Sequence, residues 1–406
     1  MLFDAAVAAA TPENCMRRWM PQRPDGRVIV VGAGKAAASM AKVLEDEWAG
    51  PLEGQVIVPR AYGSDCRSIE VVEASHPIPD AAGVAATEDI LALVSNLSTD
   101  DTVICLISGG GSSLLCLPAA GVSLAEKQAI TSALLKSGAA IHEINCVRKK
   151  LSAIKGGKLA AACAPAQLVT LVISDVPGND VAAVASGPTV ADVSSPSEAL
   201  AILERYGIAI SDSARRAIMS SKATTAADGD IRILATSDDA LLASAALALE
   251  NDVTPYSLGD LSGDARTLGA EHAALAKQIA AGNGPVEPPC VILSGGETTV
   301  NVRGDGRGGR NGEYALSLAL ALEGHASIHA LAGDTDGIDG GGDNAGYFVS
   351  PTTLMKAEKY SVDATTALHE NNSYNFFEPL GDLLITGPTR TNVNDFRAIL
   401  VASEKE

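Results

Sequence analysis

The amino-acid sequence predicts an α/β fold of two α/β domains with mostly parallel sheets, the N-terminal domain being Rossmann-like. Short β-branched runs alternate with Ala- and Leu-rich segments along nearly all 406 residues, which is typical of successive βα units. These runs are continuously apolar, as in strands that are covered on both faces. The length also suits about two domains.

Four buried strands are predicted in the first half of the chain, at residues 28–31, 55–58, 102–107 and 168–173. A glycine-rich turn and an Ala-rich segment follow the first, which predicts a helix over residues 35–48. The third and fourth run into loops rich in Gly, Ser and Asp. Because ligands in open α/β sheets bind beyond the carboxyl ends of the strands, we expect functional residues in these loops.

The strand pattern restarts after a polar stretch that predicts a linker. We therefore expect an N-terminal domain over residues 1–225 and a C-terminal domain over residues 226–406. Helices are expected from residue 238 and over residues 311–322. The strands predicted in this half comprise residues 231–236, 291–294, 297–302, 328–331 and 383–386.

The composition excludes several classes of protein. With 49 acidic and 30 basic residues the chain has a formal charge of −19, which repels nucleic-acid phosphates and anionic membrane surfaces. Seven cysteines without a CxxC pair indicate reduced thiols in a cytoplasmic protein rather than a disulfide framework or a zinc site. No apolar run reaches the roughly 18 residues of a membrane span. The expected partner is a small molecule, and the oligomeric state stays open, with a homodimer as one option.

Two glycine-rich turns after predicted strands are candidate anion sites. The turn at residues 32–37 begins like a dinucleotide fingerprint, but the second strand runs into Pro59 and Arg60 instead of an acidic residue. It places Lys35 at a helix start, either as a tolerated surface cation or as a group that holds an anion together with the helix N-terminus. The turn after the third strand offers N–H groups and hydroxyls to a phosphate, unless it is merely a tight turn. Its residues are Ser108, Gly109, Gly110, Gly111, Ser112 and Ser113.

A run of cations lies at residues 145–158. It carries five Lys or Arg residues and no acid, so it is a candidate for a polyanion site, although charge runs are commonly solvated helix faces. Lys155, Gly156 and Gly157 predict a phosphate-binding turn, because the two glycines end a helix and open the backbone. Arg148 is expected to contact the substrate.

Two further charges follow predicted strands or precede a predicted helix. Asp175 comes after the fourth strand, where a carboxylate can accept a hydroxyl proton, hold Mg²⁺ or cap the turn before Pro177. Arg310 lies on a glycine-rich loop before a helix, where guanidinium and helix dipole can bind one anion. Asn311 and Glu297 are expected to contact the same substrate.

An acidic loop at residues 334–343 is a candidate metal site. It fails the EF-hand template, because Asp339 takes the position of the required Gly and no Glu stands at the twelfth position. Asp334 and Asp336 therefore predict either a Mg²⁺ site shared with ligand phosphates or a loop rich in turn residues.

Ten segments, in one order along nearly the whole chain, resemble the class II glycerate kinases, the MOFRL-type family often labelled hydroxypyruvate reductase in tartrate-utilisation operons. They are GAGKAAASM (32–40), SHPIPD (75–80), SGGGSSLL (108–115), NCVRKKLSAIKGGKLA (145–160), ISDVPGND (173–180), SGPT (186–189), LSGGETTV (293–300), GRGGRN (306–311), AGDTDGIDG (332–340) and TGPTRTNVND (386–395). Lys150 stands where the family pattern has His, and Arg390 where Gly is frequent.

The resemblance implies transfer of the ATP γ-phosphoryl group, with Mg²⁺, to the 2-hydroxyl of D-glycerate in a cleft between the two domains. It implies that Lys35 and Arg310 bind substrate carboxylate or phosphoryl charge and that Asp175 orients or deprotonates the hydroxyl. The turns at residues 108–113 and 155–157 would cradle the ATP phosphates. Two alternatives stay open, an NAD(P)H-dependent hydroxypyruvate reductase and a non-catalytic sensor of glycerate or a nucleotide.

Overall fold

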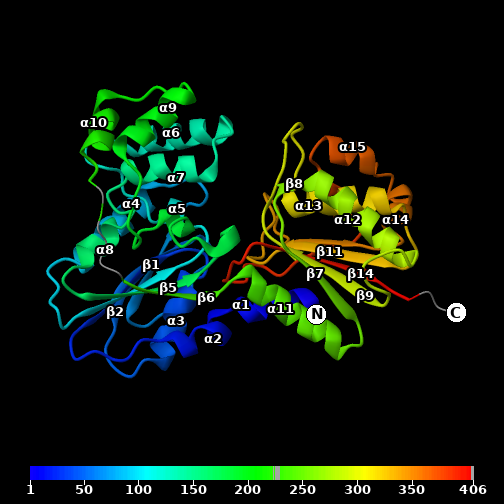
Figure 1. Cartoon of the computed structure of the whole chain (residues 1–406), viewed down its shortest axis with the longest axis horizontal. Helices are drawn as coiled ribbons and strands as arrows, with labels where there is room; N and C mark the ends of the chain where they lie inside the picture. Colours follow the sequence, from blue (N-terminus) through cyan, green and yellow to red (C-terminus); the bar gives the residue numbers. More distant parts are fainter. Residues whose placement is uncertain (223, 225–228, 404–406) are drawn as a thin grey trace. The chain divides into compact units, whose positions relative to one another are not determined.

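The computed structural model describes residues 1–222, 224 and 229–403 (Figure 1). The chain forms two compact units, one of Pro12–Leu234 and one that combines Met1–Thr11 with Ala235–Glu406. The predicted boundary at residue 225 lies outside the described residues. The first eleven residues belong to the second unit because helix α1 (Leu2–Ala10) packs there on α11 (Ser237–Glu250).

The unit Pro12–Leu234 is built on a sheet with the strand order of the Rossmann fold, β3-β2-β1-β4-β5-β6. All adjoining pairs from β3 to β5 are parallel, which confirms the predicted Rossmann-like sheet. The sequence pattern misses β3, and β6, which it assigns to the C-terminal domain, is the last strand here. The strands are β1 (Val28–Ala33), β2 (Glu53–Pro59), β3 (Ile69–Ala74), β4 (Thr102–Ile107), β5 (Gln167–Ile173) and β6 (Asp230–Ala235).

Alternate residues of these strands face opposite layers of helices. Ile29, Val31 and Ala33 of β1 belong to an apolar core that includes α4 (Ala81–Leu93) and α8 (Lys158–Cys163). Helix α3 (Ala37–Glu47) packs on the other face (Figure 1). Because parallel strands end at one edge of a sheet, the loops after β1, β4 and β5 come together there.

A layer of helices with its own apolar core belongs to the same unit. Lys150, the last residue of helix α7 (Ile141–Lys150), is buried and pairs with Asp192 at 2.8 Å. The lysine that replaces the family's His therefore has a structural role. The layer consists of α6 (Leu124–Lys136), α7 (Ile141–Lys150), α9 (Pro196–Arg205) and α10 (Asp212–Ser220). Shorter helices of the unit are α2 (Pro12–Cys15), α5 (Gly111–Leu114) and the 3₁₀ turns η1 (Arg17–Trp19), η2 (Pro177–Asn179) and η3 (Val184–Ser186).

Removing Asp192 is expected to destabilise this unit strongly. Asp192→Ala would leave the Lys150 ammonium buried without a carboxylate, and breaking a buried pair in this way lowers the free energy of unfolding by about 3–5 kcal/mol. Urea unfolding followed by tryptophan fluorescence reports on this unit, because both tryptophans of the chain lie in it. The control Lys42→Ala removes a surface ion pair with Asp46 and should leave the midpoint nearly unchanged. Equal midpoints for the two variants would contradict the expectation.

The second unit is built on a mixed sheet of order β13-β12-β11-β14-β9-β7. Four of its described strand pairs are antiparallel and one, β7–β9, is parallel, so the prediction of a mostly parallel sheet is wrong for this unit. The strand predicted at residues 297–302 is reduced to β10 (Thr298–Thr299), which pairs with β8 (Gly263–Asp264). The sheet strands are β7 (Thr254–Asp260), β9 (Cys290–Gly295), β11 (Ile328–Asp334), β12 (Gly346–Val349), β13 (Leu383–Leu384) and β14 (Asp395–Val401).

Helices cover both faces of the second sheet. α12 (Ala265–Ala280) and α13 (Arg310–Leu322) lie on one face, and α1 and α11 lie on the other (Figure 1). The remaining helices are α14 (Thr353–Lys359), α15 (Ala364–His369) and α16 (Ser373–Phe377). In the described ranges of the chain, every helix is too short or too polar to span a membrane.

Candidate active site

The turn after β1 is closed by the loop after β4. Gly34 has a φ of 138°, and a Cβ atom there would lie 2.2 Å from the Ser108 hydroxyl, so the approach requires glycine. The Ala36 N–H donates to the Ser108 hydroxyl (2.9 Å) and the Lys35 N–H donates to the Gly109 carbonyl (2.8 Å). The N–H groups of Lys35 and Ala36, just before α3, are therefore paired within the protein. Ser108, which we expected to bind phosphate, is fully buried and holds the two loops together instead.

Gly109 and Gly110 form the open part of the β4 loop. A Cβ atom on Gly110 would lie 3.0 Å from the His76 ring and 3.5 Å from Cγ of Lys35, so these two side chains flank the glycine. Within the described residues, the N–H groups of Gly109 and Gly110 have no acceptor. Two adjacent amides beside a lysine suit a bound anion.

The two serines of the loop differ in their partners. The Ser113 hydroxyl donates to the Gly110 carbonyl (3.1 Å). The Ser112 hydroxyl lies 2.7 Å from the hydroxyl of Ser186, which in turn donates to the Asn145 side chain (3.0 Å). These contacts fix the side of the loop that faces α7.

The predicted phosphate-binding turn at Lys155 is held by a left-handed segment. Ala185 and Ser186 have φ values of 51° and 61°, a conformation that costs about 1–3 kcal/mol per residue. The Gly156 N–H donates to the Ser186 carbonyl (3.2 Å), and the Gly157 N–H is likewise paired, with the Gly187 carbonyl (2.9 Å). Since their amides are occupied, Gly156 and Gly157 position Lys155 rather than offering N–H groups to a phosphate.

Three cations, Lys127, Arg148 and Lys155, line one pocket of about 690 Å³ in this unit. None of them pairs with a carboxylate in the described part of the chain. Burial lowers the pKa of all three groups, most strongly that of Lys155, to which the charges of Lys127 and Arg148 contribute. An anion in the pocket would relieve this repulsion. Lys127 lies on α6, outside the run of cations, and is not among the residues predicted from the sequence.

Two other cations of the run support the backbone instead. Lys150 forms the buried pair described above, and Lys158 donates to the carbonyls of Lys149 (2.8 Å) and Ser152. Only part of the predicted cation run therefore belongs to the pocket within the described chain.

Asp175 lies two residues beyond β5 and is half-buried. Because β5 adjoins β4 and β4 adjoins β1, its carboxylate comes from the same edge of the sheet as Lys35 and the β4 loop. The predicted cation and carboxylate thus occupy neighbouring strand ends, an arrangement that can serve a reacting hydroxyl and an anion together.

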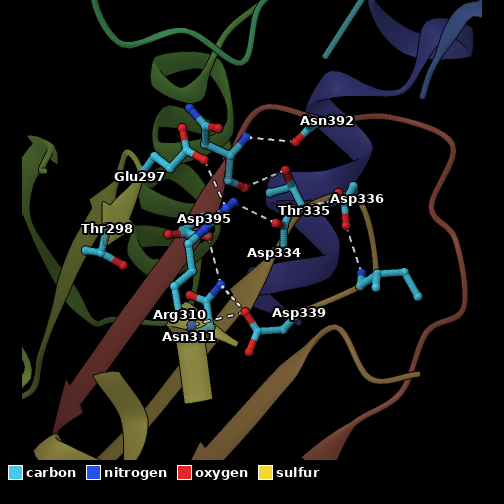
Figure 2. A network of polar contacts seen from close by, with 12 residues as sticks. Glu297, Thr298, Arg310, Asn311, Asp334, Thr335, Asp336, Asp339, Asn392 and Asp395 are labelled. Atoms are coloured by element: carbon cyan, nitrogen blue, oxygen red, sulfur yellow. Dashed lines mark hydrogen bonds and ion pairs between the residues drawn. The ribbon is translucent and has the colours of Figure 1, made fainter. Parts of the chain in front are cut away.

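Arg310, in the second unit, is surrounded by carboxylates (Figure 2). Its guanidinium pairs with Glu297 at 2.9 Å and with Asp334 and Asp395 at 2.7 Å each. Although burial acts in the opposite direction, these three charges hold the pKa of Arg310 well above its ordinary value. Asp334 and Asp395 are buried, whereas the Glu297 side chain is 50% exposed.

The helix N-terminus beside Arg310 is occupied by the chain itself. The Asp339 carboxylate accepts hydrogen bonds from the N–H groups of Asn311 (3.0 Å) and Gly312 (3.1 Å), in the place where we expected a substrate anion. The side-chain amide of Asn311 donates to the Asp395 carboxylate (2.7 Å), and Asn311 is fully buried. The side chain therefore supports this network and is not placed to contact a substrate.

Stability near Asp339 is expected to depend on pH. Burial raises the pKa of Asp339 from 3.8 to about 6, so the stability that this group contributes is complete below pH 4 and is lost as the pH rises through 6. The shift corresponds to about 3 kcal/mol. Relative to Asp339→Asn, the wild type should lose up to that amount between pH 4 and pH 8. Urea unfolding followed by tyrosine fluorescence measures it, since five of the seven tyrosines lie in this unit; a pH-independent difference would contradict the expectation.

Asp334 and Asp336 are held by contacts within the chain. Asp334 pairs with Arg310 and accepts from the Asp336 N–H (3.1 Å), and the Asp336 carboxylate accepts from the Ile338 N–H (2.8 Å). Throughout the described residues, no group of three or more His, Cys, Asp and Glu side chains is placed to hold a metal ion. These contacts hold the loop, and a Mg²⁺ site that the two carboxylates share with ligand phosphates stays a prediction.

Comparison with known proteins identifies two family domains. Residues 1–219 match the family described as a domain of unknown function, DUF4147, and residues 290–395 match the MOFRL family.

Individual relatives extend over nearly the whole chain. A protein of Agrobacterium vitis named "Putative hydroxypyruvate reductase" is 49% identical, over 98% of this chain and 93% of that one. A D-glycerate 2-kinase of Thermotoga maritima is 41% identical, over 97% and 95%. The crystal structure of a glycerate kinase from Thermotoga maritima matches with a TM-score of 0.90 at 39% identity, over 99% of this chain and 98% of that one.

Proposed function

The chain belongs to the family that joins a DUF4147 domain to a MOFRL domain and includes glycerate kinases, and on this basis we propose that it transfers the γ-phosphoryl group of ATP to the 2-hydroxyl of D-glycerate. The products are ADP and 2-phosphoglycerate. The observation that carries the proposal is the group of cations that line one pocket, the buried Lys127 and Lys155 and the half-buried Arg148, which have no carboxylate partner in the described chain. Such a group suits a polyphosphate.

The same unit argues against a hydroxypyruvate reductase. A Rossmann dinucleotide site holds the pyrophosphate at the first helix N-terminus and the ribose on an acidic residue after the second strand. Here the N–H groups of Lys35 and Ala36, just before α3, are paired with Gly109 and Ser108. The second strand ends at Pro59 and is followed by Arg60, so the acidic residue that would bind the ribose is replaced by a cation.

The proposed reaction assigns a role to each charge at the sheet edge. The 2-hydroxyl oxygen forms a bond to the γ-phosphorus while the bond from that phosphorus to the ADP oxygen breaks. Asp175 orients the hydroxyl and accepts its proton. Lys35, beside Gly110, stabilises the negative charge of the transferring group, and the Gly109 and Gly110 amides assist it.

Arg310 is proposed to bind the carboxylate of D-glycerate. Of its three partners Glu297 is the exposed one, so a substrate carboxylate can replace it while Asp334 and Asp395 keep the guanidinium in place. That Arg310 and Lys35 serve one active site in an interdomain cleft stays a prediction.

We propose that Mg²⁺ accompanies ATP. Magnesium in phosphoryl-transfer sites is held by one or two carboxylates together with substrate phosphates, and when bound it neutralises phosphate charge. The described residues contain no preformed group of three or more such ligands, so substrate phosphates would supply part of the coordination.

We also propose a cytoplasmic location. All seven cysteines are free, and six of them are buried, as suits a protein kept in a reducing compartment.

A two-arm assay of the purified chain tests the proposed function. One arm contains Mg-ATP and D-glycerate and measures ADP; the other contains NADH or NADPH with hydroxypyruvate and measures nicotinamide oxidation. We expect ADP in the first arm alone. Nicotinamide oxidation without ADP would establish the reductase, and binding of ATP or glycerate without turnover in either arm would establish the sensor.

A further inference from the structure

The pocket that contains Lys127, Arg148 and Lys155 is larger than a phosphate chain or glycerate requires. Its volume of about 690 Å³ lies in the range of about 300–1,000 Å³ that encloses whole small ligands. D-Glycerate, a three-carbon acid, would leave most of this space unfilled. The lining of the remaining space therefore indicates a second, larger part of the ligand.

The pocket has a cationic end and an apolar end. Helix α6 lines it from Leu124 to Leu135, and its Lys127 lies near Arg148 and Lys155. Lys127 and Leu135 are about 12 Å apart along the helix axis, which leaves room for a sugar and a chain of phosphates between a base and the cations.

Two apolar side chains of the pocket lining are unusually exposed. Ile78, from the segment that follows β3, is 67% exposed, and Leu135, on α6, is 56% exposed, although both line the pocket. The Gln128 side chain donates to the Pro79 carbonyl (2.6 Å), which ties α6 to the segment of Ile78. The two apolar groups are thus carried by elements that are already fixed to each other, and a flat ring between them would remove apolar surface from water.

We propose that this pocket binds a whole nucleoside triphosphate, with its phosphates against Lys127, Arg148 and Lys155 and its base between Ile78 and Leu135. The proposal rests on the proposed function, which supplies ATP as the phosphoryl donor. In this proposal Arg148, which was expected to contact the substrate, contacts the phosphates of the donor instead. It also makes Lys127 a phosphate-binding residue, paired with no other anion in the described chain.

Calorimetric titration of the full chain tests the two ends of the pocket separately. The ligands are Mg-ATP, Mg-tripolyphosphate and D-glycerate, each added alone. The double variant Ile78→Ser/Leu135→Ser removes the apolar end, and Lys127→Met removes one charge from the other end. The matched control is Val193→Ser/Met219→Ser, which replaces two exposed apolar side chains of the same unit that do not line this pocket.

The apolar double variant should bind Mg-ATP at least tenfold more weakly and Mg-tripolyphosphate within twofold of wild type. Lys127→Met should bind both at least tenfold more weakly, and the control should bind both normally. The proposal is overturned if Mg-ATP does not bind the wild type or if neither variant binds Mg-ATP more weakly than the wild type does. It is also overturned if the apolar double variant weakens the binding of D-glycerate instead of that of Mg-ATP.

Failure of this proposal is distinguishable from failure of the proposed function. If Mg-ATP binds as described but D-glycerate is not phosphorylated, the pocket assignment stands and the kinase assignment fails. If 2-phosphoglycerate forms but the apolar variant leaves the KM for ATP unchanged, the pocket assignment fails alone.

Discussion

A chain in which Lys35 is replaced by Met is expected to remain folded and to phosphorylate D-glycerate about 10²–10³-fold more slowly. The stem of the Lys35 side chain flanks Gly110, next to the open amides of Gly109 and Gly110, and loss of one charged donor at a developing negative charge has an effect of this size. Steady-state kinetics should show the loss mainly in kcat, because the charge that Lys35 stabilises develops in the transition state.

The control for this substitution is Lys149→Met, which removes a cation from the run at residues 145–158 that does not line the pocket. It should retain normal turnover. If Lys35→Met keeps turnover within threefold of wild type, Lys35 does not act on the reacting phosphate.

Asp175→Asn is expected to lower kcat by about 10²–10⁴-fold, the usual contribution of a general base. The amide keeps the size of the side chain but cannot accept the hydroxyl proton, so the KM for ATP should change little. Asp180→Asn is the matched control, because its exposed carboxylate lies in the same loop and caps only the Ala182 N–H. Equal kcat values for the two variants would remove Asp175 from the reaction.

Burial on both faces made the first sheet predictable from the sequence. Every residue of β1 and β4 is buried, so each strand is a continuous apolar run. Strand β14 is different, because Arg397 interrupts its apolar pattern. That side chain is buried in the structure, where it donates to the Gly295 carbonyl (2.7 Å) and pairs with Asp395. Asp395 lies two residues away on the same strand, but the Gly295 carbonyl comes from β9, which is distant in sequence and gives no local signal. The antiparallel sheet was missed with β14.

The positions of Lys35 and Asp175 at strand ends were predictable, because each charge follows an apolar strand closely in sequence. Lys127 carries a weaker signal: it lies three and seven residues before Ile130 and Leu134, on the buried face of α6, and a cation in such a stripe is unusual.

At the helix start of Asn311 the sequence pattern predicted a site that the chain itself occupies. The local residues suit a bound ligand anion, but the Asp339 carboxylate takes that position, and its loop reaches the helix only in the tertiary fold.

Phosphorus NMR of the reaction product tests the central claim most directly. After incubation of the chain with Mg-ATP and D-glycerate, the proton-coupled spectrum should contain a new phosphomonoester doublet, because the single proton on carbon 2 splits the signal of 2-phosphoglycerate. A triplet from the CH₂ group at carbon 3 would contradict the assigned acceptor. ATP signals that stay unchanged at high enzyme concentration would contradict phosphoryl transfer altogether.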